Sequence, residues 1–182
     1  MSRRSSVAWR RMSSPLQTWQ LLLRPITADD VRYIITWRYE SPYDIYNMGS
    51  GLDDAIELAE AIDYFLRPQY HFQAMLRQPT GELAGFCSFG SDGQVAGGDY
   101  RNPAVDIGMG VHPQYTGRGL GYTFAGAAID FALANFKQPQ LRVTIAEFNR
   151  RAQKVWERHN FVPMQHFLSL YSKRPFIIYV RE

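Results

Sequence analysis

Apolar residues recur along this chain with two different periods, and the changes between them predict the order of its elements. From Ala55 to Leu66 they lie three or four positions apart, which places them on one face of a helix. Between Val105 and Val111 they alternate with Asp and Gly, which is the pattern of a strand. The whole chain predicts a strand, two helices, three strands, a helix, a strand, a helix and two strands.

Turn and capping residues mark where these elements begin and end. Thr27 and Asp30 form a capping-box-like helix start, and Pro68 ends the second helix. Strands are expected within residues 16–27, 70–76, 83–89, 104–113, 141–145, 161–170 and 176–180, and helices from 27, 53–67, 121–136 and 150–159. Residues 40–51 and 91–102, rich in Gly and Pro, are expected to be loops. This mixed order predicts an α/β (α+β) fold, one sheet with helices packed against it.

The charge of the chain is concentrated at its beginning. The first eleven residues hold four arginines and no acid, while the net charge of all 182 residues is +3. The remainder is therefore nearly neutral and has no basic stripe, so we expect no nucleic-acid partner. We predict a disordered basic tail over residues 1–18 and a single domain over 19–182. A transit peptide, or an over-extended start ahead of Met12, is the alternative for the tail.

Cysteine, histidine and hydropathy exclude several other classes of protein. The single cysteine, Cys87, lies in an apolar strand, which favours core packing and excludes an internal disulfide. The four histidines lack metal-ligand spacing, so we expect no metal. No run approaches the roughly 18 apolar residues of a membrane span. We therefore expect a cytoplasmic protein with no membrane partner.

The segment Val111–Gly121 is a strand that runs into a glycine turn and then a helix. Glycines at 117, 119 and 121 let successive backbone N–H groups converge, and the helix N-terminus adds positive charge. This combination suits a pyrophosphate. The segment has no lysine for a P-loop, and its glycine spacing does not fit a dinucleotide fingerprint. A plain turn with incidental glycines is the alternative.

Two segments resemble the GNAT acetyltransferases. Val111–Gly121 is similar to that family's V-x-P strand end and R/Q-x-x-G-x-G/A loop, and Asn149–Phe161 to its N-x-x-A-x-x-x-Y-E-K-x-G-F segment. The resemblance covers roughly Leu21 to Val180, and the Rim-like acetyltransferases are one subgroup that it would fit. It implies a mixed, mostly antiparallel six- to seven-stranded sheet flanked by about four helices. It also implies direct acetyl transfer from acetyl-CoA to a primary amine of a small molecule or peptide.

The chain departs from the family pattern at three positions. Thr116 replaces Arg or Gln, although Gln114 fits a shifted register. Asn160 replaces a glycine, and asparagine is the substitute expected where φ is positive. Trp156 replaces the tyrosine often proposed to protonate the CoA thiolate, and an indole N–H is no usable acid. These departures leave a non-catalytic acyl-CoA-binding module as an alternative, and an unrelated α+β binding domain as another.

The resemblance also implies which residues form the site. The expected cofactor contacts are Met109, Val111, Thr116, Gly117, Arg118, Gly119, Leu120, Gly121, Asn149 and Trp156. Asn149 could instead cap the following helix. The N–H of Val111 is expected to polarise the thioester carbonyl. Gly108 and Gly110 indicate either close ligand approach or a bulge in this strand.

Catalysis further requires a base, because an amine acceptor is mostly protonated at neutral pH. Asp106 is the expected base or water-orienting residue, and Glu147 is the second candidate. The expected acceptor site is lined by Trp37, Glu40, Tyr43 and Tyr46. Their rings and carboxylates suit a cationic amine, and packing is the alternative for the rings. A homodimer is compatible with the sequence.

Overall fold

The computed structural model describes residues 19–49, 53–138 and 140–182, so the expected basic tail lies outside the described residues. Seven strands form one sheet in the order β1-β2-β3-β4-β5-β7-β6. The strands are β1 (Leu21–Pro25), β2 (Gln73–Arg77), β3 (Glu82–Phe89), β4 (Val105–Val111), β5 (Leu141–Ala146), β6 (Val162–Leu168) and β7 (Pro175–Arg181). The helices are α1 (Ala28–Ile34), α2 (Ala55–Phe65), α3 (Gly121–Asn135) and α4 (Arg150–Glu157). The predicted order of elements and the predicted fold class are confirmed.

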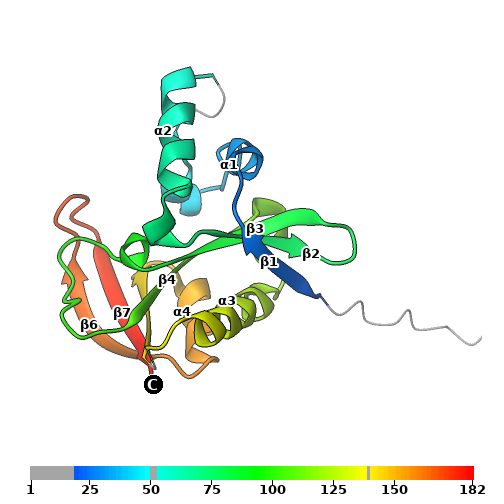
Figure 1. The fold of residues 1–182 in the computed structure, drawn as a ribbon. Coiled ribbons are helices and arrows are strands. Elements are labelled where there is room, and N and C mark those ends of the chain that lie inside the picture. The colour runs from blue at the N-terminus through cyan, green and yellow to red at the C-terminus, as the bar shows by residue number, and fades with distance from the viewer. Residues whose placement is uncertain (1–18, 50–52, 139) are drawn as a thin grey trace, which may run out of the picture.

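Helices cover both faces of the sheet. Helices α1 and α2 lie on one face, and α3 and α4 lie on the other (Figure 1). Each face has its own core, with Phe89, Phe124 and Phe161 buried toward α3 and α4. Val31 and Phe72 are buried toward α1 and α2. Cys87 is fully buried in the first of these cores, as its apolar strand predicts.

Local signals in the sequence account for several boundaries. Thr27 caps α1, and the side chain of Asp30 bonds back to the Thr27 backbone, so the predicted capping box is present. Asn160 has φ of +65°, the left-handed conformation expected from its replacement of a glycine. The two predicted loops also contain 3₁₀ turns, η1 (Tyr43–Tyr46) and η3 (Ser91–Gly93).

Neighbouring strands are antiparallel except for β4 and β5, which run parallel and soon separate. They pair only at Val105–Leu141 and Asp106–Arg142. Beyond these pairs β4 stays with β3 as far as Val111, while β5 stays with β7 as far as Ala146. A gap therefore opens between the carboxyl ends of the two central strands. We call it the β4–β5 gap.

Candidate active site

The edge of β4 that faces the β4–β5 gap carries backbone groups that no described strand pairs. The N–H of His112 donates to Ala84 on β3, so the backbone groups of even-numbered residues of β4 point toward β3. Those of Met109 and Val111 point the other way, into the gap, where no described strand pairs with them. A ligand amide lying in the gap could therefore pair with this edge as another strand would.

The glycine turn follows directly from this edge. Gly117 has φ of +72° and Gly119 has φ of +77°, conformations that favour glycine. A Cβ on Gly119 would meet no protein atom within 4 Å, so this side of the turn is open. The hydroxyl of Thr116 donates to the carbonyl of Pro113 at 2.9 Å, so this side chain supports the turn.

The turn leads into an α3 N-terminus that suits an anion. Leu120 is the N-cap residue, and no side chain caps the first N–H groups of α3. Arg118 is exposed in the turn. Arg151 of α4 lies opposite, because a Cβ on Gly117 would be 3.4 Å from its Nη1 atom. An uncapped helix start, with Arg118 in the turn before it and Arg151 beside Gly117, suits a pyrophosphate, and Arg151 is not among the contacts expected from the sequence.

Gly108 and Gly110 lie where side chains of the neighbouring strand approach the backbone of β4. The β3–β4 register is regular, so neither glycine marks a bulge. A Cβ on Gly108 would overlap the Ser88 hydroxyl, and one on Gly110 would overlap the ring of Phe86. Both positions therefore accommodate side chains of β3 on the α1–α2 face of the sheet.

Asp106 is held in a buried ion pair. Its Oδ1 accepts from Arg142 Nε at 2.5 Å and its Oδ2 from Arg142 Nη2 at 2.8 Å. Gln94 donates to Oδ2 as well, at 2.7 Å, and the Asp106 side chain is 3% exposed. A carboxylate so fully paired is poorly available to an amine, and the geometry supports a structural role instead.

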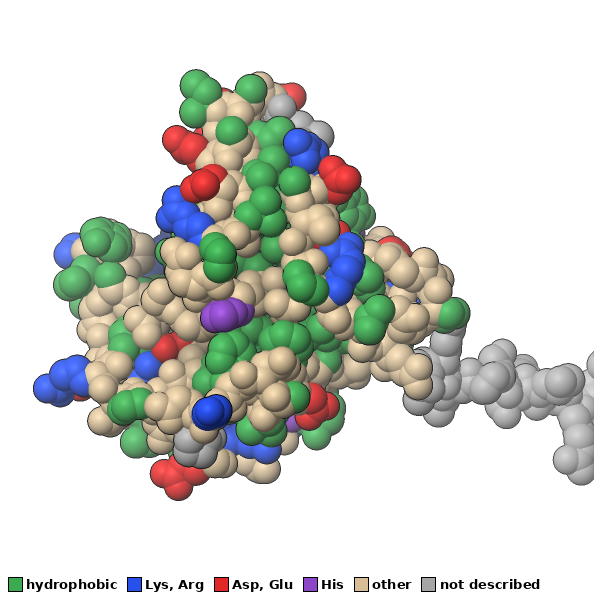
Figure 2. Space-filling view, in the orientation of Figure 1, with side chains coloured by type: hydrophobic (Ala, Val, Ile, Leu, Met, Phe, Trp, Pro, Cys, Tyr) green, Lys and Arg blue, Asp and Glu red, His purple; other side chains and the backbone are tan. Residues whose placement is uncertain are grey.

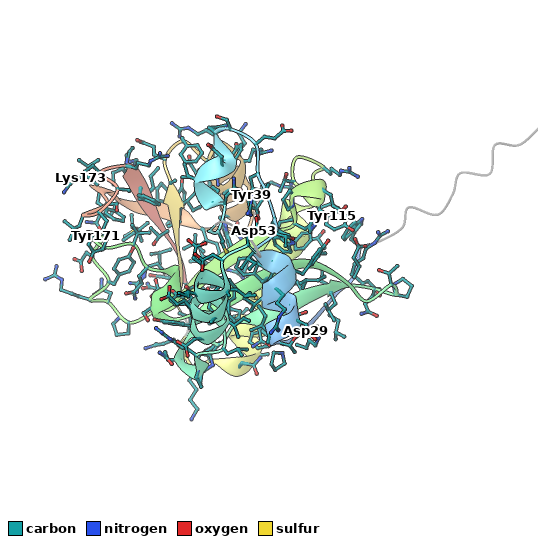
Figure 3. The ribbon with its side chains drawn as sticks, turned by 90° about the horizontal axis from the view of Figure 1, so that it is seen from above. Asp29, Tyr39, Asp53, Tyr115, Tyr171 and Lys173 are labelled. Atoms are coloured by element: carbon teal, nitrogen blue, oxygen red, sulfur yellow. The ribbon has the colours of Figure 1, made fainter. Side chains whose placement is uncertain are left out.

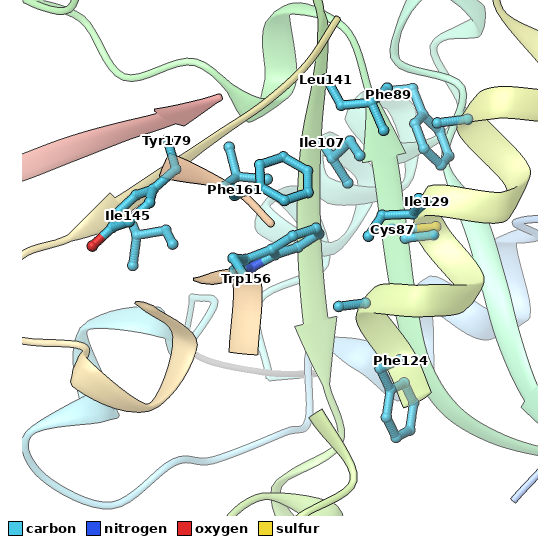
Figure 4. Close-up of a cluster of buried hydrophobic side chains, with 14 of the residues drawn as sticks. Cys87, Phe89, Ile107, Phe124, Ile129, Leu141, Ile145, Trp156, Phe161 and Tyr179 are labelled. Carbon is cyan, nitrogen blue, oxygen red and sulfur yellow. The ribbon is translucent and has the colours of Figure 1, made fainter. Parts of the chain in front are cut away.

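Asn149 and Trp156 lie on α4, close to the gap but in different surroundings. Asn149 Oδ1 accepts from the backbone N–H of Ala152 at 3.1 Å, so Asn149 caps α4, as the alternative expectation stated. Its amide nitrogen makes a separate hydrogen bond, to the hydroxyl of Tyr46. Trp156 is buried, and its ring lies 5.0 Å from that of Phe161 (Figure 4). The family tyrosine is thus replaced here by a core residue.

The segment from Trp37 to Tyr46 lies beside β4 and α4, but its residues differ in exposure. Trp37 is buried against Phe86, with ring centroids 5.9 Å apart, which corresponds to the packing alternative. Glu40 is exposed. Tyr39, which belongs to the same aromatic cluster of the sequence, donates its hydroxyl to the carbonyl oxygen of Val111 at 3.0 Å. Burial raises the pKa of Tyr39 above its usual value, so the hydroxyl stays protonated.

The η1 turn connects this segment to α4. Arg151 Nε donates to the hydroxyl of Tyr43 at 2.9 Å, and its guanidinium lies 3.8 Å from the centre of that ring. Asn149 Nδ2 donates to the hydroxyl of Tyr46 at 3.2 Å. Both tyrosine rings pack against Phe148, at 5.7 and 6.2 Å. The segment expected to bind the acceptor therefore crosses the gap from β4 to α4.

Phe148 and Arg151 are residues beside the candidate site that the sequence did not indicate. Tyr39 belongs to the aromatic cluster that the sequence places near the first helix, but its bond to β4 could not be predicted. Arg151 occupies an unspecified position of the matched family pattern, and Phe148 lies just before that pattern begins. Only the fold brings them next to η1.

The described part of the chain holds no cluster of three metal-ligating side chains. Within the same residues, no helix has the length and apolar character to cross a membrane. A family model described as an acetyltransferase (GNAT) domain matches residues 20–162. No curated protein sequence matches the chain.

Solved structures with similar folds include two acetyltransferases. One is the spermidine N-acetyltransferase of Vibrio cholerae in complex with CoA and spermine, with a TM-score of 0.68 and 17% identity. The similarity covers 89% of this chain and 95% of that one. The other is a GNAT-family acetyltransferase from Bacillus anthracis, with a TM-score of 0.67 and 14% identity over 88% of this chain and 93% of that one. At these identities the likeness shows the fold alone.

Proposed function

The chain belongs to the acetyltransferase (GNAT) domain family, and from this premise we propose how its site transfers acetyl from acetyl-CoA to an amine. The observation that carries the proposal is the β4–β5 gap, whose free N–H groups lead into the uncapped start of α3. A thioester with a pantetheine arm and a pyrophosphate needs both features, in that order along the site. Binding would place its amides along Met109 and Val111 and its phosphates at the turn.

The backbone N–H groups of this edge would also assist the chemistry. An N–H donor aimed at the thioester oxygen stabilises the negative charge that develops there during attack, and Val111 is our candidate. The acceptor must first lose a proton. Of the two carboxylates expected for this role, Asp106 is enclosed by Arg142, whereas the Glu147 side chain is 38% exposed and lies 3.5 Å from His166. We therefore favour Glu147, directly or through a water.

The distribution of charge favours a cationic acceptor. Residues 37–67, which include the acceptor segment and α2, contain seven acids and two arginines, Arg38 and Arg67. Figure 2 shows acidic side chains on the surface of the part of the molecule formed by α1 and α2. Residues 148–158 of the cofactor side contain four basic residues and one acid. Such a dipolar arrangement would steer a phosphorylated cofactor and a positively charged amine to opposite sides of the gap.

Polyamines are the first acceptors to test, because they are cationic amines and because one structure of similar fold holds spermine. The assay follows release of free CoA thiol from acetyl-CoA with spermine, spermidine, single amino acids and a lysine-containing peptide. We expect turnover with cationic acceptors and little with acidic ones. Equal rates with both kinds of amine would contradict the cationic assignment.

Trp156 is the observation that favours the alternative function, a module that binds acyl-CoA without turnover. Acetyl-CoA should stabilise the folded protein under either function, by about 2.7 kcal/mol at a hundredfold excess over its Kd. Thermal melting measures this. A melting temperature unchanged by millimolar acetyl-CoA would exclude both functions, whereas stabilisation without thiol release from any amine would leave only the binding module.

A further inference from the structure

The proposed reaction leaves one proton without a source. When an amine displaces CoA, the C–S bond breaks and the sulfur keeps the electron pair, so a proton must reach it. In the family this proton is attributed to a tyrosine on α4, and Trp156 occupies that position here. The indole is buried in the core beside Phe161 and has no acidic proton. This inference rests on the proposed function. If acetyl transfer occurs here, another group near the gap must supply the proton.

Several donors near the gap are already engaged. The proton of Tyr39 is donated to the Val111 carbonyl oxygen. The imidazole of His112 accepts from the Gln114 backbone at Nδ1, 3.2 Å away, and contacts the Tyr33 hydroxyl at Nε2, 3.0 Å away. Neither group is free to donate to a sulfur in the gap without losing a bond that holds the site together.

Tyr46 is differently placed. Its ring lies 6.5 Å from that of Tyr39, which is bonded to β4, and 6.2 Å from that of Phe148, which follows β5. Tyr46 therefore spans the opening between the two separating strands. Its hydroxyl receives a hydrogen bond from Asn149 Nδ2 at 3.2 Å, so the oxygen acts as an acceptor there and its own proton remains available.

The surroundings of Tyr46 suit a proton donor that must regain its proton after each turnover. The residue is 37% exposed, so water can return a proton to it after each turnover. Burial raises the pKa of Tyr46 and the bond from Asn149 opposes this, with smaller influences from Tyr43 and Arg174. The net upward direction keeps the phenol protonated at neutral pH.

We propose that Tyr46 is the proton donor to the departing CoA sulfur. As the C–S bond breaks, the Tyr46 O–H bond transfers its proton to the sulfur and the electron pair of that bond stays on the phenolate oxygen. The N–H of Asn149 stabilises this phenolate, and solvent reprotonates it. Asn149 thus positions the donor, in addition to capping α4.

Kinetics of Tyr46→Phe test this assignment. We expect kcat to fall about 100-fold or more, the usual contribution of general acid catalysis, while the Kd of acetyl-CoA rises by no more than about tenfold. The control is Tyr171→Phe, which removes a phenol hydroxyl from the exposed turn between β6 and β7 (88% exposed), away from the gap, and should leave kcat near the wild-type value. Melting temperatures confirm that both variants are folded. A Tyr46→Phe enzyme with kcat within threefold of wild type would overturn the proposal.

Restoring the family hydroxyl provides a second measurement. In the double variant Tyr46→Phe/Trp156→Tyr, a phenol on α4 can take over the proton transfer, so kcat should recover at least tenfold from the single variant. A merely structural role for Tyr46 would not be rescued by a hydroxyl on another helix. Loss of kcat in Tyr46→Phe without such recovery would therefore assign Tyr46 to positioning and overturn the proposal.

Binding gives a readout that needs no turnover. If the Tyr46 hydroxyl contacts the sulfur, Tyr46→Phe should weaken the binding of CoA about threefold to tenfold, as expected for one neutral hydrogen bond. Desulfo-CoA, which lacks the sulfur, should bind wild type and variant alike. Calorimetric titration measures both ligands. Equal changes for the two ligands would count against the contact. This result would overturn the Tyr46 assignment alone if wild type and Tyr171→Phe still transfer acetyl, so it is distinct from a failure of the proposed function.

Discussion

The hydroxyl of Tyr39 donates to the carbonyl oxygen of Val111 at 3.0 Å, across 72 positions of sequence. This bond attaches the acceptor segment, Trp37 to Tyr46, to the edge of β4 that is expected to hold the thioester. Tyr39→Phe removes it, and we expect a loss of about 1 kcal/mol in the free energy of unfolding. Denaturant unfolding measures the loss. Tyr171→Phe, at a position 88% exposed, is the control and should have no effect, and equal stabilities for both variants would contradict the importance of this bond.

The glycine turn can be tested with two glycines of the same conformation. Gly119 and Gly81 have φ of +77° and +72°, and a Cβ at either would meet nothing within 4 Å. Gly119→Val and Gly81→Val should therefore lose similar stability, about 1–3 kcal/mol, from backbone strain. Only Gly119→Val should lose acetyl-CoA binding, because its side chain enters the open side of the turn. Normal affinity in Gly119→Val, measured by calorimetry, would place the phosphates elsewhere.

The ion pair of Asp106 predicts an effect on stability. Asp106→Asn leaves the Arg142 guanidinium, 4% exposed, without its counter-charge, so we expect a loss of about 3–5 kcal/mol in the free energy of unfolding. Replacing both partners, as in Asp106→Leu/Arg142→Met, should cost much less. A fully stable Asp106→Asn protein with reduced turnover would instead return Asp106 to the role of general base.

The cationic acceptor predicts a change in KM at Glu40. Glu40→Gln removes an exposed carboxylate from the acceptor segment, so KM for a polyamine should rise about twofold to fivefold, which corresponds to less than about 1 kcal/mol for a screened charge. Acetyl-CoA affinity should not change. Asp29→Asn, on the exposed side of α1, is the control and should leave KM as it is (Figure 3). Identical KM values for the two variants would move the acceptor away from Glu40.

Stability at low pH should depend on Asp30. Burial raises the pKa of this carboxyl, but the hydrogen bonds from Arg24 and Thr27 outweigh burial and leave the pKa below its usual value. A lowered pKa means that the charged form stabilises the fold above about pH 4 and that this contribution disappears as the pH falls further. Asp30→Asn should lose about 2 kcal/mol at pH 7 and progressively less toward pH 2, as followed by thermal melting. A difference independent of pH would contradict this.

The sequence was sufficient for the features that depend on neighbours along the chain. Alternation in Val105–Val111 and helical spacing in Ala55–Leu66 specified a strand and a helix, because these periods decide which side chains share a face. The positive φ of Gly119 and Asn160 could likewise be predicted, since few residues tolerate that conformation. Such local rules predict the order of elements and the position of the glycine turn.

Only the tertiary structure decided which side chains lie together at the proposed site. Asp106 and Arg142 are 36 positions apart, and the parallel start of β4 and β5 makes them a buried pair. Tyr46 and Asn149 are 103 positions apart, and they meet because η1 crosses the gap to α4. The spacing of residues in the sequence indicates the period of one helix or strand, but not how two of them pack together. Whether the Asp106 carboxylate is paired and whether the Tyr46 phenol keeps its proton available therefore depend on the assembled sheet.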